Sequence, residues 1–179
     1  MPKLPRGLKT LTVVVRVLSV LGVALVCVLA LLWLKPDWLR EAVRAGILGN
    51  GAWPLVIDGR ARLLGALGAL PRTALGLFAL WQLWRLFGHY AAGRFFDRVT
   101  QAYLRRFAWA MLLSALLLPL ERGWIGLALT LGNPPGQRTL QLGLAPSDFL
   151  AILLSTVVLG VSKVVSEVGR PAEGNAARA

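Results

Sequence analysis

Eighteen consecutive residues, Val17–Leu34 (VLSVLGVALVCVLALLWL), carry no charge and a single hydroxyl, that of Ser19. A helix needs roughly 20 residues to cross the hydrocarbon layer of a bilayer. The valines before the run lengthen it if Arg16 extends its side chain towards the headgroups. The run exceeds the ~7–15 apolar residues of a signal-peptide core, and no small-residue cleavage site follows it. The segment therefore predicts a retained transmembrane helix in a membrane protein.

The apolar content of the whole chain agrees with this class. Hydrophobic residues make up 56% of the 179 residues, which exceeds the roughly 45–50% of soluble domains. They fall into four blocks, which predict spans at about residues 13–34, 71–87, 104–120 and 149–165. The expected fold class is an all-α membrane protein with four transmembrane helices, a single domain over residues 1–179 that ends in a short flexible tail at 170–179.

The second span allows two interpretations. Only Thr73–Trp84 is free of charge, between Arg72 and Arg85. If the helix starts near Pro71, Arg72 extends to the headgroups. If it runs unbroken from Leu63, Arg72 lies inside the membrane, which costs at least ~2.5–3.5 kcal/mol and indicates a functional role. The sequence favours the interfacial position, and Arg72 at membrane depth would favour transport.

The ends of the first and fourth spans carry local signals. Pro36 ends the first span, and Trp33 and Trp38 suit the headgroup layer. Ser147 is the expected N-cap of the fourth span. Asp148 lies in the first turn of the same span, where the helix dipole favours a carboxylate.

The connector between the third and fourth spans has a different pattern. Polar or small residues alternate with leucines over Thr139–Leu144, as in a half-buried strand, after the turn sequence Asn133–Gly136. This pattern predicts a small extracytoplasmic β-hairpin cap at about residues 124–144, with residues 53–57 as a candidate third strand. Such a cap either receives a ligand or keeps the outer connectors ordered.

Basic residues indicate the orientation, because Lys and Arg resist translocation and mark the cytoplasmic side. An even number of spans places both termini on one side. With the termini inside, twelve of the 20 basic residues are cytoplasmic: Lys3, Arg6, Lys9, Arg16, Arg85, Arg94, Arg98, Arg105, Arg106, Lys163, Arg170 and Arg178. We therefore expect cytoplasmic termini.

The excess of basic residues at the cytoplasmic ends of the spans also accounts for the net charge of +12. Basic residues at helix ends contact anionic headgroups, at ~1 kcal/mol each, and the lipid bilayer is the expected partner. No compact basic module accompanies the charge, so no direct nucleic-acid binding is expected.

The chain contains no motif that indicates catalysis. We find no catalytic triad, phosphate loop, haem motif or metal-ligand spacing, and His89 and Cys27 are the only residues of their types. An intramembrane hydrolase needs a nucleophile with a base or paired acids at membrane depth, and Ser114, Ser155 and Ser162 have no such neighbours in sequence. We expect no enzyme activity, no cofactor and no metal.

The connector between the second and third spans is the candidate partner-binding segment. Its glycine permits a tight turn, its phenylalanines can bury against the helices or the inner leaflet, and Asp97 is placed to cap the next helix. Either it is a structural helix hairpin, or it docks a cytoplasmic protein beside an exposed ring of His89 or Tyr90. The candidate residues are Gly93, Arg94, Phe96, Asp97, Arg98, Leu104 and Arg105.

This connector resembles a family of uncharacterised bacterial membrane proteins, domain of unknown function 2975. The similarity lies in Gly93–Asp97 and Leu104–Ala108, where Asp97 replaces the family's Ser or Thr cap, and it extends over residues 139–170. The tail departs from the family pattern, because Pro171 and Gly174 interrupt a usually longer charged helix. The resemblance implies four spans in a bacterial inner membrane. Because family members are often encoded beside a small helix-turn-helix regulator, it also implies such a regulator as a cytoplasmic DNA-binding partner.

Two functions remain open at this point. The favoured one is a non-enzymatic regulatory or accessory protein that binds a cytoplasmic partner through residues 93–106. The alternative is a small transporter or channel component, against which stands the scarcity of ionisable residues within the spans. Only Arg72 and the adjacent Glu121 and Arg122 are candidates for that role.

Overall fold

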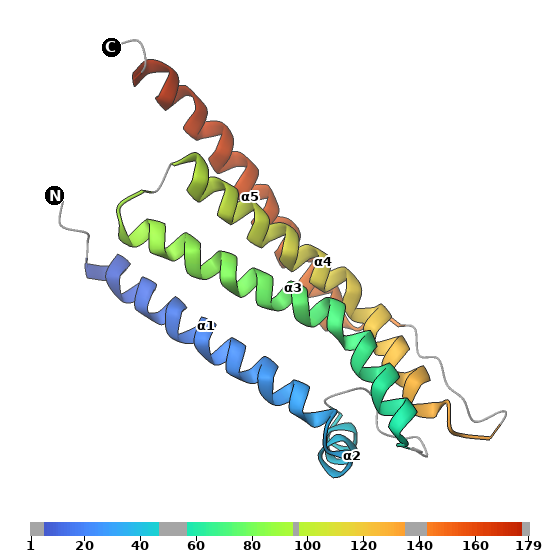
Figure 1. Ribbon diagram of the computed structural model, residues 1–179. Helices are drawn as coiled ribbons and strands as arrows, with labels where there is room; N and C mark the ends of the chain where they lie inside the picture. Colours follow the sequence, from blue (N-terminus) through green and yellow to red (C-terminus); the bar gives the residue numbers. More distant parts are fainter. Residues whose placement is uncertain (1–5, 47–56, 95–96, 135–142, 177–179) are drawn as a thin grey trace.

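The computed structural model describes residues 6–46, 57–94, 97–134 and 143–176, and every regular element among them is an α-helix. The helices are α1 (Arg6–Leu32), α2 (Pro36–Arg44), α3 (Gly59–Ala91), α4 (Arg98–Thr130) and α5 (Pro146–Ala176) (Figure 1). All except α2 are long and apolar enough to cross a membrane. For the described residues, the predicted all-α fold with four candidate membrane spans is thereby confirmed.

The four long helices form an open row in the order α1, α3, α4, α5, and each packs mainly against its neighbours in that row (Figure 1). α1 begins, α5 ends and α3 turns into α4 at the same end of the row, which we call the connector end. α2 lies across the opposite end, which we call the α2 end. The outer faces of α1 and α5 carry many exposed large apolar side chains, as expected for helices that contact lipid.

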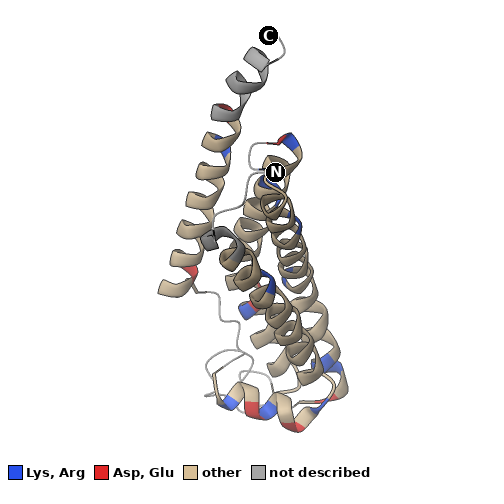
Figure 2. Cartoon of the chain, turned by 90° about the vertical axis from the view of Figure 1, so that its left-hand side faces the viewer, with Lys and Arg blue, Asp and Glu red and all other residues tan. Residues whose placement is uncertain are grey.

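The short helix α2 is amphipathic and closes the α2 end. Pro36 occupies its first turn, where a missing N–H removes no helical hydrogen bond. Its buried face contributes Leu39 and Val43 to a cluster with Ile125 and Leu129 of α4. Its other face carries exposed charges (Figure 2). α2 therefore fixes the last two turns of α4.

The N-terminus of α3 is fixed by two sets of hydrogen bonds. The carboxylate of Asp58, the N-cap residue, accepts the backbone N–H of Ala61 at 2.7 Å. One helical turn further on, Arg62 donates to the backbone oxygens of Trp33 at 3.0 Å and Leu34 at 2.9 Å. These carbonyls follow the end of α1 and lack helical partners, so Arg62 ties α3 to α1.

Both central helices are longer than the sequence predicted. The second span, predicted for 71–87, belongs to a helix of 33 residues that passes through Pro71 without a break. The third, predicted for 104–120, likewise continues through Pro119 to Thr130. A proline in a helix removes one hydrogen bond and crowds the preceding turn. Here α3 and α4 contact each other on both sides of the prolines, through Trp124 and Leu64 on one side and His89 and Tyr103 on the other, and this packing maintains the helices.

The predicted β-hairpin cap is wrong in its first part, because Trp124–Thr130 continue helix α4. The apolar residues there are buried at helical spacing, with Ile125 and Leu129 both against α2, and the Thr130 hydroxyl bonds to the backbone oxygen of Gly126 at 2.9 Å. No strand occurs in the described part of the chain. The remaining segments predicted as strands lie largely outside the described residues, at 135–142 and 53–56.

Small polar residues form the face of α5 that packs on α4. Asp148, Ser155 and Ser162 are spaced seven residues apart and are all buried. The two serine hydroxyls bond to backbone oxygens of α5 itself, at 2.6 Å to Ala151 and 2.7 Å to Leu159. Small side chains allow membrane helices to approach closely. This face places Asp148 against α4.

Candidate functional site

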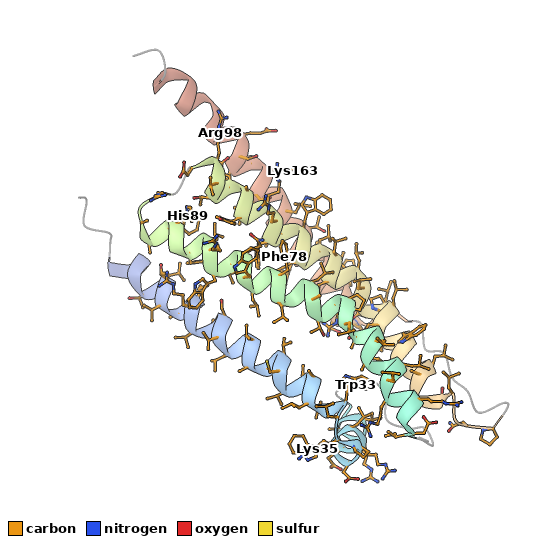
Figure 3. All side chains as sticks on the ribbon, in the orientation of Figure 1. Trp33, Lys35, Phe78, His89, Arg98 and Lys163 are labelled. Carbon is orange, nitrogen blue, oxygen red and sulfur yellow. The ribbon has the colours of Figure 1, made fainter. Side chains whose placement is uncertain are left out.

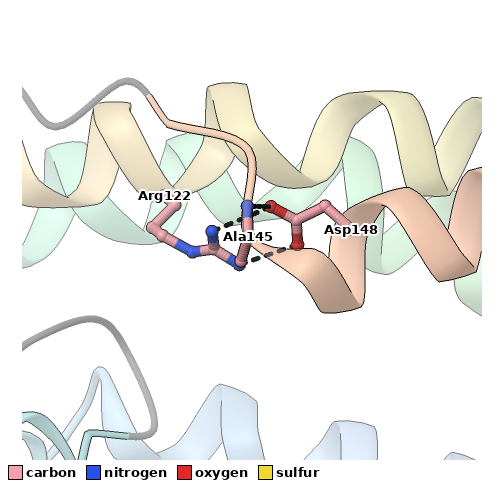
Figure 4. Close-up of polar contacts among 3 residues, drawn as sticks. All are labelled: Arg122, Ala145 and Asp148. Atoms are coloured by element: carbon pink, nitrogen blue, oxygen red, sulfur yellow. Dashed lines mark hydrogen bonds and ion pairs between the residues drawn. The ribbon is translucent and has the colours of Figure 1, made fainter.

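Arg122 of α4 and Asp148 of α5 form a bidentate ion pair (Figure 4). The two terminal guanidinium nitrogens donate to the two carboxylate oxygens, both at 2.9 Å. The Asp148 side chain is fully buried, whereas that of Arg122 is 31% exposed. A paired fork of this kind is among the stronger hydrogen-bonded contacts in proteins.

Asp148 also caps α5, contrary to the prediction for Ser147. The helix begins at Pro146, so Ala145 occupies the N-cap position. One carboxylate oxygen of Asp148 accepts the Ala145 N–H at 2.8 Å (Figure 4). An acidic residue in the third helical position reaches back in this way in a capping box. Sequence reasoning placed Asp148 in the first turn but missed its partner on α4.

A second ion pair joins Arg72 of α3 to Glu121 of α4, with the Arg72 Nε donating to a carboxylate oxygen. The Glu121 side chain is largely buried, at 12% exposure, and that of Arg72 is 40% exposed. A pocket of about 210 Å³ lies beside this pair, lined by Pro71, Leu117 and Trp124 among others. The sequence had singled out Arg72, Glu121 and Arg122 and left their partners open.

The four residues Arg72, Glu121, Arg122 and Asp148 form what we call the charged layer. Because Glu121 and Arg122 are consecutive on α4, the two pairs connect α3, α4 and α5 at one level. The layer has no net charge. Pairing offsets much of the desolvation of each ion, whereas removal of one partner leaves an unpaired charge.

The length of α3 bears on the two interpretations of the second span. Arg72 and Arg85 are thirteen residues apart, about 20 Å at ~1.5 Å per residue. This distance is shorter than the ~30 Å thickness of a hydrocarbon layer. α3 is continuous from Gly59 to Ala91, so a layer of that thickness would include Arg72 if it began at Arg85. The unbroken-helix interpretation therefore fits the structure.

Close packing of tryptophans on glycines surrounds the charged layer. The indole N–H of Trp124 donates to the backbone oxygen of Leu64 at 2.8 Å. A Cβ atom at Gly68 would overlap the Trp124 ring, and one at Gly65 would overlap the Trp33 ring. These glycines are needed for close approach and not for a special backbone angle.

Gln82 of α3 is a second polar feature between the connector end and the charged layer, and sequence reasoning missed it. Its side chain is 1% exposed, and neither amide atom has a hydrogen-bond partner in the described structure. Burial of an amide without a partner costs ~1–3 kcal/mol. The only available signal was a lone glutamine in an apolar run, which does not reveal whether the residue is buried.

The predicted partner-binding residues lie at the connector end. Gly93 has a φ of +77°, the left-handed conformation that glycine adopts without strain. Arg94, Asp97, Arg98 and Arg105 are exposed, Leu104 is half-buried, and Phe96 lies outside the described residues. Figure 3 shows Arg98 and Lys163 at this end of the row, opposite Trp33 and Lys35. The structure thus brings several predicted residues to one exposed end.

Two details of this connector differ from the prediction. Asp97 occupies the N-cap position of α4 as expected, but its side chain makes no capping hydrogen bond. Instead, the buried hydroxyl of Thr100 donates to the backbone oxygen of Arg94 at 2.9 Å and closes the turn. Neither His89 nor Tyr90 is an exposed ring: both are half-buried, and the His89 ring packs on Tyr103 at 5.3 Å between centroids.

Among the described residues, no three His, Cys, Asp or Glu side chains are grouped so as to hold a metal ion. Comparisons with protein-family models, with curated proteins and with solved structures find no match. The geometry of the chain itself therefore carries the functional argument.

Proposed function

We propose that the protein is a non-enzymatic accessory or regulatory protein of a bacterial inner membrane that binds a cytoplasmic partner at its connector end. The observation that carries this proposal is the exposure of Arg94, Arg98 and Arg105 around the Gly93 turn. The turn joins the two closely packed helices α3 and α4. The packing of α3 on α4 fixes where the backbone of this end lies, so a partner that binds here has to order mainly the arginine side chains.

The chemistry of this surface fits an acidic partner. Guanidinium groups bind carboxylates through paired hydrogen bonds, and the only carboxylate of the predicted set is Asp97. In the proposed orientation this end faces the cytoplasm, which agrees with the basic bias of its residues. The resemblance to domain of unknown function 2975 supports a small helix-turn-helix regulator as the partner.

Cross-linking in the native host tests this proposal. A photoreactive amino acid at Val99, which is 50% exposed, captures whatever contacts the connector, and mass spectrometry identifies it. We expect one small DNA-binding protein, whose capture is lost in the Arg94→Ala/Arg98→Ala/Arg105→Ala variant. The matched control removes three exposed arginines from the α2 end, Arg40, Arg44 and Arg60, and should retain capture. Equal capture by both triple variants would contradict the proposal.

A second candidate function is a small transporter or channel component. The observations that favour it are the ionisable residues of the charged layer and the unpartnered amide of Gln82 on the same helix pair. Polar groups at membrane depth are typical of ion and proton pathways. A pH-sensitive dye trapped in proteoliposomes tests this: transport predicts proton flux above that of protein-free liposomes, and its reduction by Gln82→Leu. Flux at the protein-free rate rejects proton transport.

A further inference from the structure

A groove lies between α1 and α3 on the connector side of the charged layer. Its volume is about 540 Å³, within the ~300–1,000 Å³ range of pockets that hold small molecules. Its walls are almost entirely apolar and include Val20 and Val23 of α1 and Leu77 of α3. The two helices meet at Gly22, where a Cβ atom would lie 3.0 Å from a methyl carbon of Leu80.

Two arginines border the groove where it approaches the connector end. The guanidinium carbon of Arg16 lies 5.2 Å from the ring centroid of Trp84. That of Arg85 lies 5.8 Å from the ring centroids of both Trp81 and Tyr103, the latter on α4. Both tryptophans line the groove. A cation over an aromatic face is stabilised by the ring quadrupole, which holds each guanidinium group beside the apolar wall.

The charge of these arginines has no counterion in the described structure. Arg16 Nε is buried without a hydrogen-bond partner, and neither Arg16 nor Arg85 forms an ion pair among the described residues. The sequences of α1 and α3, which build the groove, contain no Asp or Glu. An anion that neutralises this end of the groove must therefore come from another element or another molecule.

We propose that the groove and its two arginines bind one anionic phospholipid. An acyl chain lies along the apolar wall, and the phosphate accepts hydrogen bonds from Arg16 and Arg85. Arginine suits this role because its planar fork matches phosphate oxygens, and basic pockets between helices on the cytoplasmic side are typical of anionic lipid sites. The site is independent of the partner-binding function proposed above.

The charge pattern favours a lipid over a second copy of the chain. A two-fold contact through this groove places the arginines of both copies in one interface, and neither α1 nor α3 supplies a carboxylate to neutralise them. Like charges in a desolvated interface oppose association. An anionic lipid supplies both the apolar chain and the negative charge.

Lipid retention by the purified full-length protein tests the proposal. Native mass spectrometry of protein loaded with dioleoyl phosphatidylglycerol or dioleoyl phosphatidylcholine, which share their acyl chains, reports binding of each lipid. We expect phosphatidylglycerol to bind more tightly. Arg16→Gln/Arg85→Gln should weaken its binding about 30-fold, from the typical contribution of two basic residues. Ala24→Phe, which fills the groove, should weaken both lipids, and inorganic phosphate alone should not bind.

Controls separate a lipid site from a folding defect or a dimer. Arg40→Gln/Arg44→Gln removes the same charge at the α2 end and should bind phosphatidylglycerol as the unchanged protein does. Arg16→Lys/Arg85→Lys, which keeps the charge, should restore part of the preference, a recovery that a misfolded double variant does not show. Unchanged phosphatidylglycerol binding in the glutamine variant overturns the proposal, as does a dimer that Ala24→Phe dissociates without loss of lipid.

Discussion

The Asp148 carboxylate has two structural roles: it pairs with Arg122 of α4, and it caps its own helix. It is fully buried, and its charge is tolerated only because the guanidinium group is in place. The exposed pair of Asp37 and Arg40 on α2 has a longer contact of 3.7 Å between solvated groups. The two pairs should therefore differ strongly in what they contribute to stability.

Replacement of Asp148 by asparagine should destabilise the protein by about 3 kcal/mol. This value is the lower end of the ~3–5 kcal/mol typical of a broken buried pair, since Arg122 remains partly exposed. Reversible unfolding of the purified protein in mixed micelles gives the free energy. Asp37→Asn is the matched control and should leave it unchanged. A double variant, Asp148→Asn/Arg122→Met, should recover part of the lost free energy of unfolding. If it recovers none, the loss comes mainly from the capping hydrogen bond and not from the broken ion pair.

Replacement of Gln82 by leucine should raise the free energy of unfolding or leave it unchanged. The side chains have similar size, and the substitution removes an amide whose burial without a partner costs ~1–3 kcal/mol. Gln82→Ala is the comparison and should destabilise, because it leaves a cavity. The same unfolding measurement applies. Clear destabilisation by leucine would indicate that the amide binds water or another group in the membrane.

At the scale of helices, the sequence indicated the four apolar segments but not the length of the two central helices. Pro71 and Pro119 are strong breaking signals in isolation, yet α3 and α4 pass through them. The alternation around Trp124 predicted a strand, whereas Ile125 and Leu129 meet α2 at helical spacing. Packing against neighbouring helices decides whether such a segment continues a helix, and a local sequence pattern does not reveal those tertiary contacts.

The charged layer was predictable only in part, for the same reason. Arg72, Glu121 and Arg122 were recognisable as charges within apolar sequence. Their pairing was not, because Asp148 lies 26 residues from Arg122 and Glu121 lies 49 residues from Arg72 along the chain. Nor does the sequence reveal which glycines accept a neighbouring tryptophan.

Two glycines of α3 provide a matched test of the contact between α3 and α4. Gly68→Ala should destabilise the protein by ~1–3 kcal/mol, because its Cβ overlaps the Trp124 ring and overpacking forces side chains to shift. Gly76 has no such neighbour within 4 Å, and its replacement by alanine should stabilise the helix by up to ~1 kcal/mol. Thermal unfolding of the two variants and the unchanged protein in the same detergent compares their stabilities. Equal effects at the two positions would reject close α3–α4 packing at Gly68.

At the scale of the whole molecule, the open row leaves different faces for different neighbours. α3 and α4 each pack on both sides, whereas α1 and α5 expose apolar side chains between Leu11 and Leu31 and between Phe149 and Val164. Lipid tails are as apolar as leucine, so hydrophobicity alone does not determine which helices associate in a membrane. Small residues and ion pairs determine the order instead, through Gly22, Gly68 and the charged layer.

The orientation of the row decides whether the connector end can meet a cytoplasmic partner at all. In a Cys27→Ala background, single cysteines at the exposed residues Ala45 and Ala92 mark the α2 end and the connector end. We expect a membrane-impermeant maleimide to label Ala45→Cys in spheroplasts and Ala92→Cys only after lysis, because basic residues at the connector end resist translocation. Both cysteines should react in detergent, which controls for accessibility. Labelling of Ala92→Cys alone before lysis would place Arg94, Arg98 and Arg105 outside and would exclude a cytoplasmic partner at this surface.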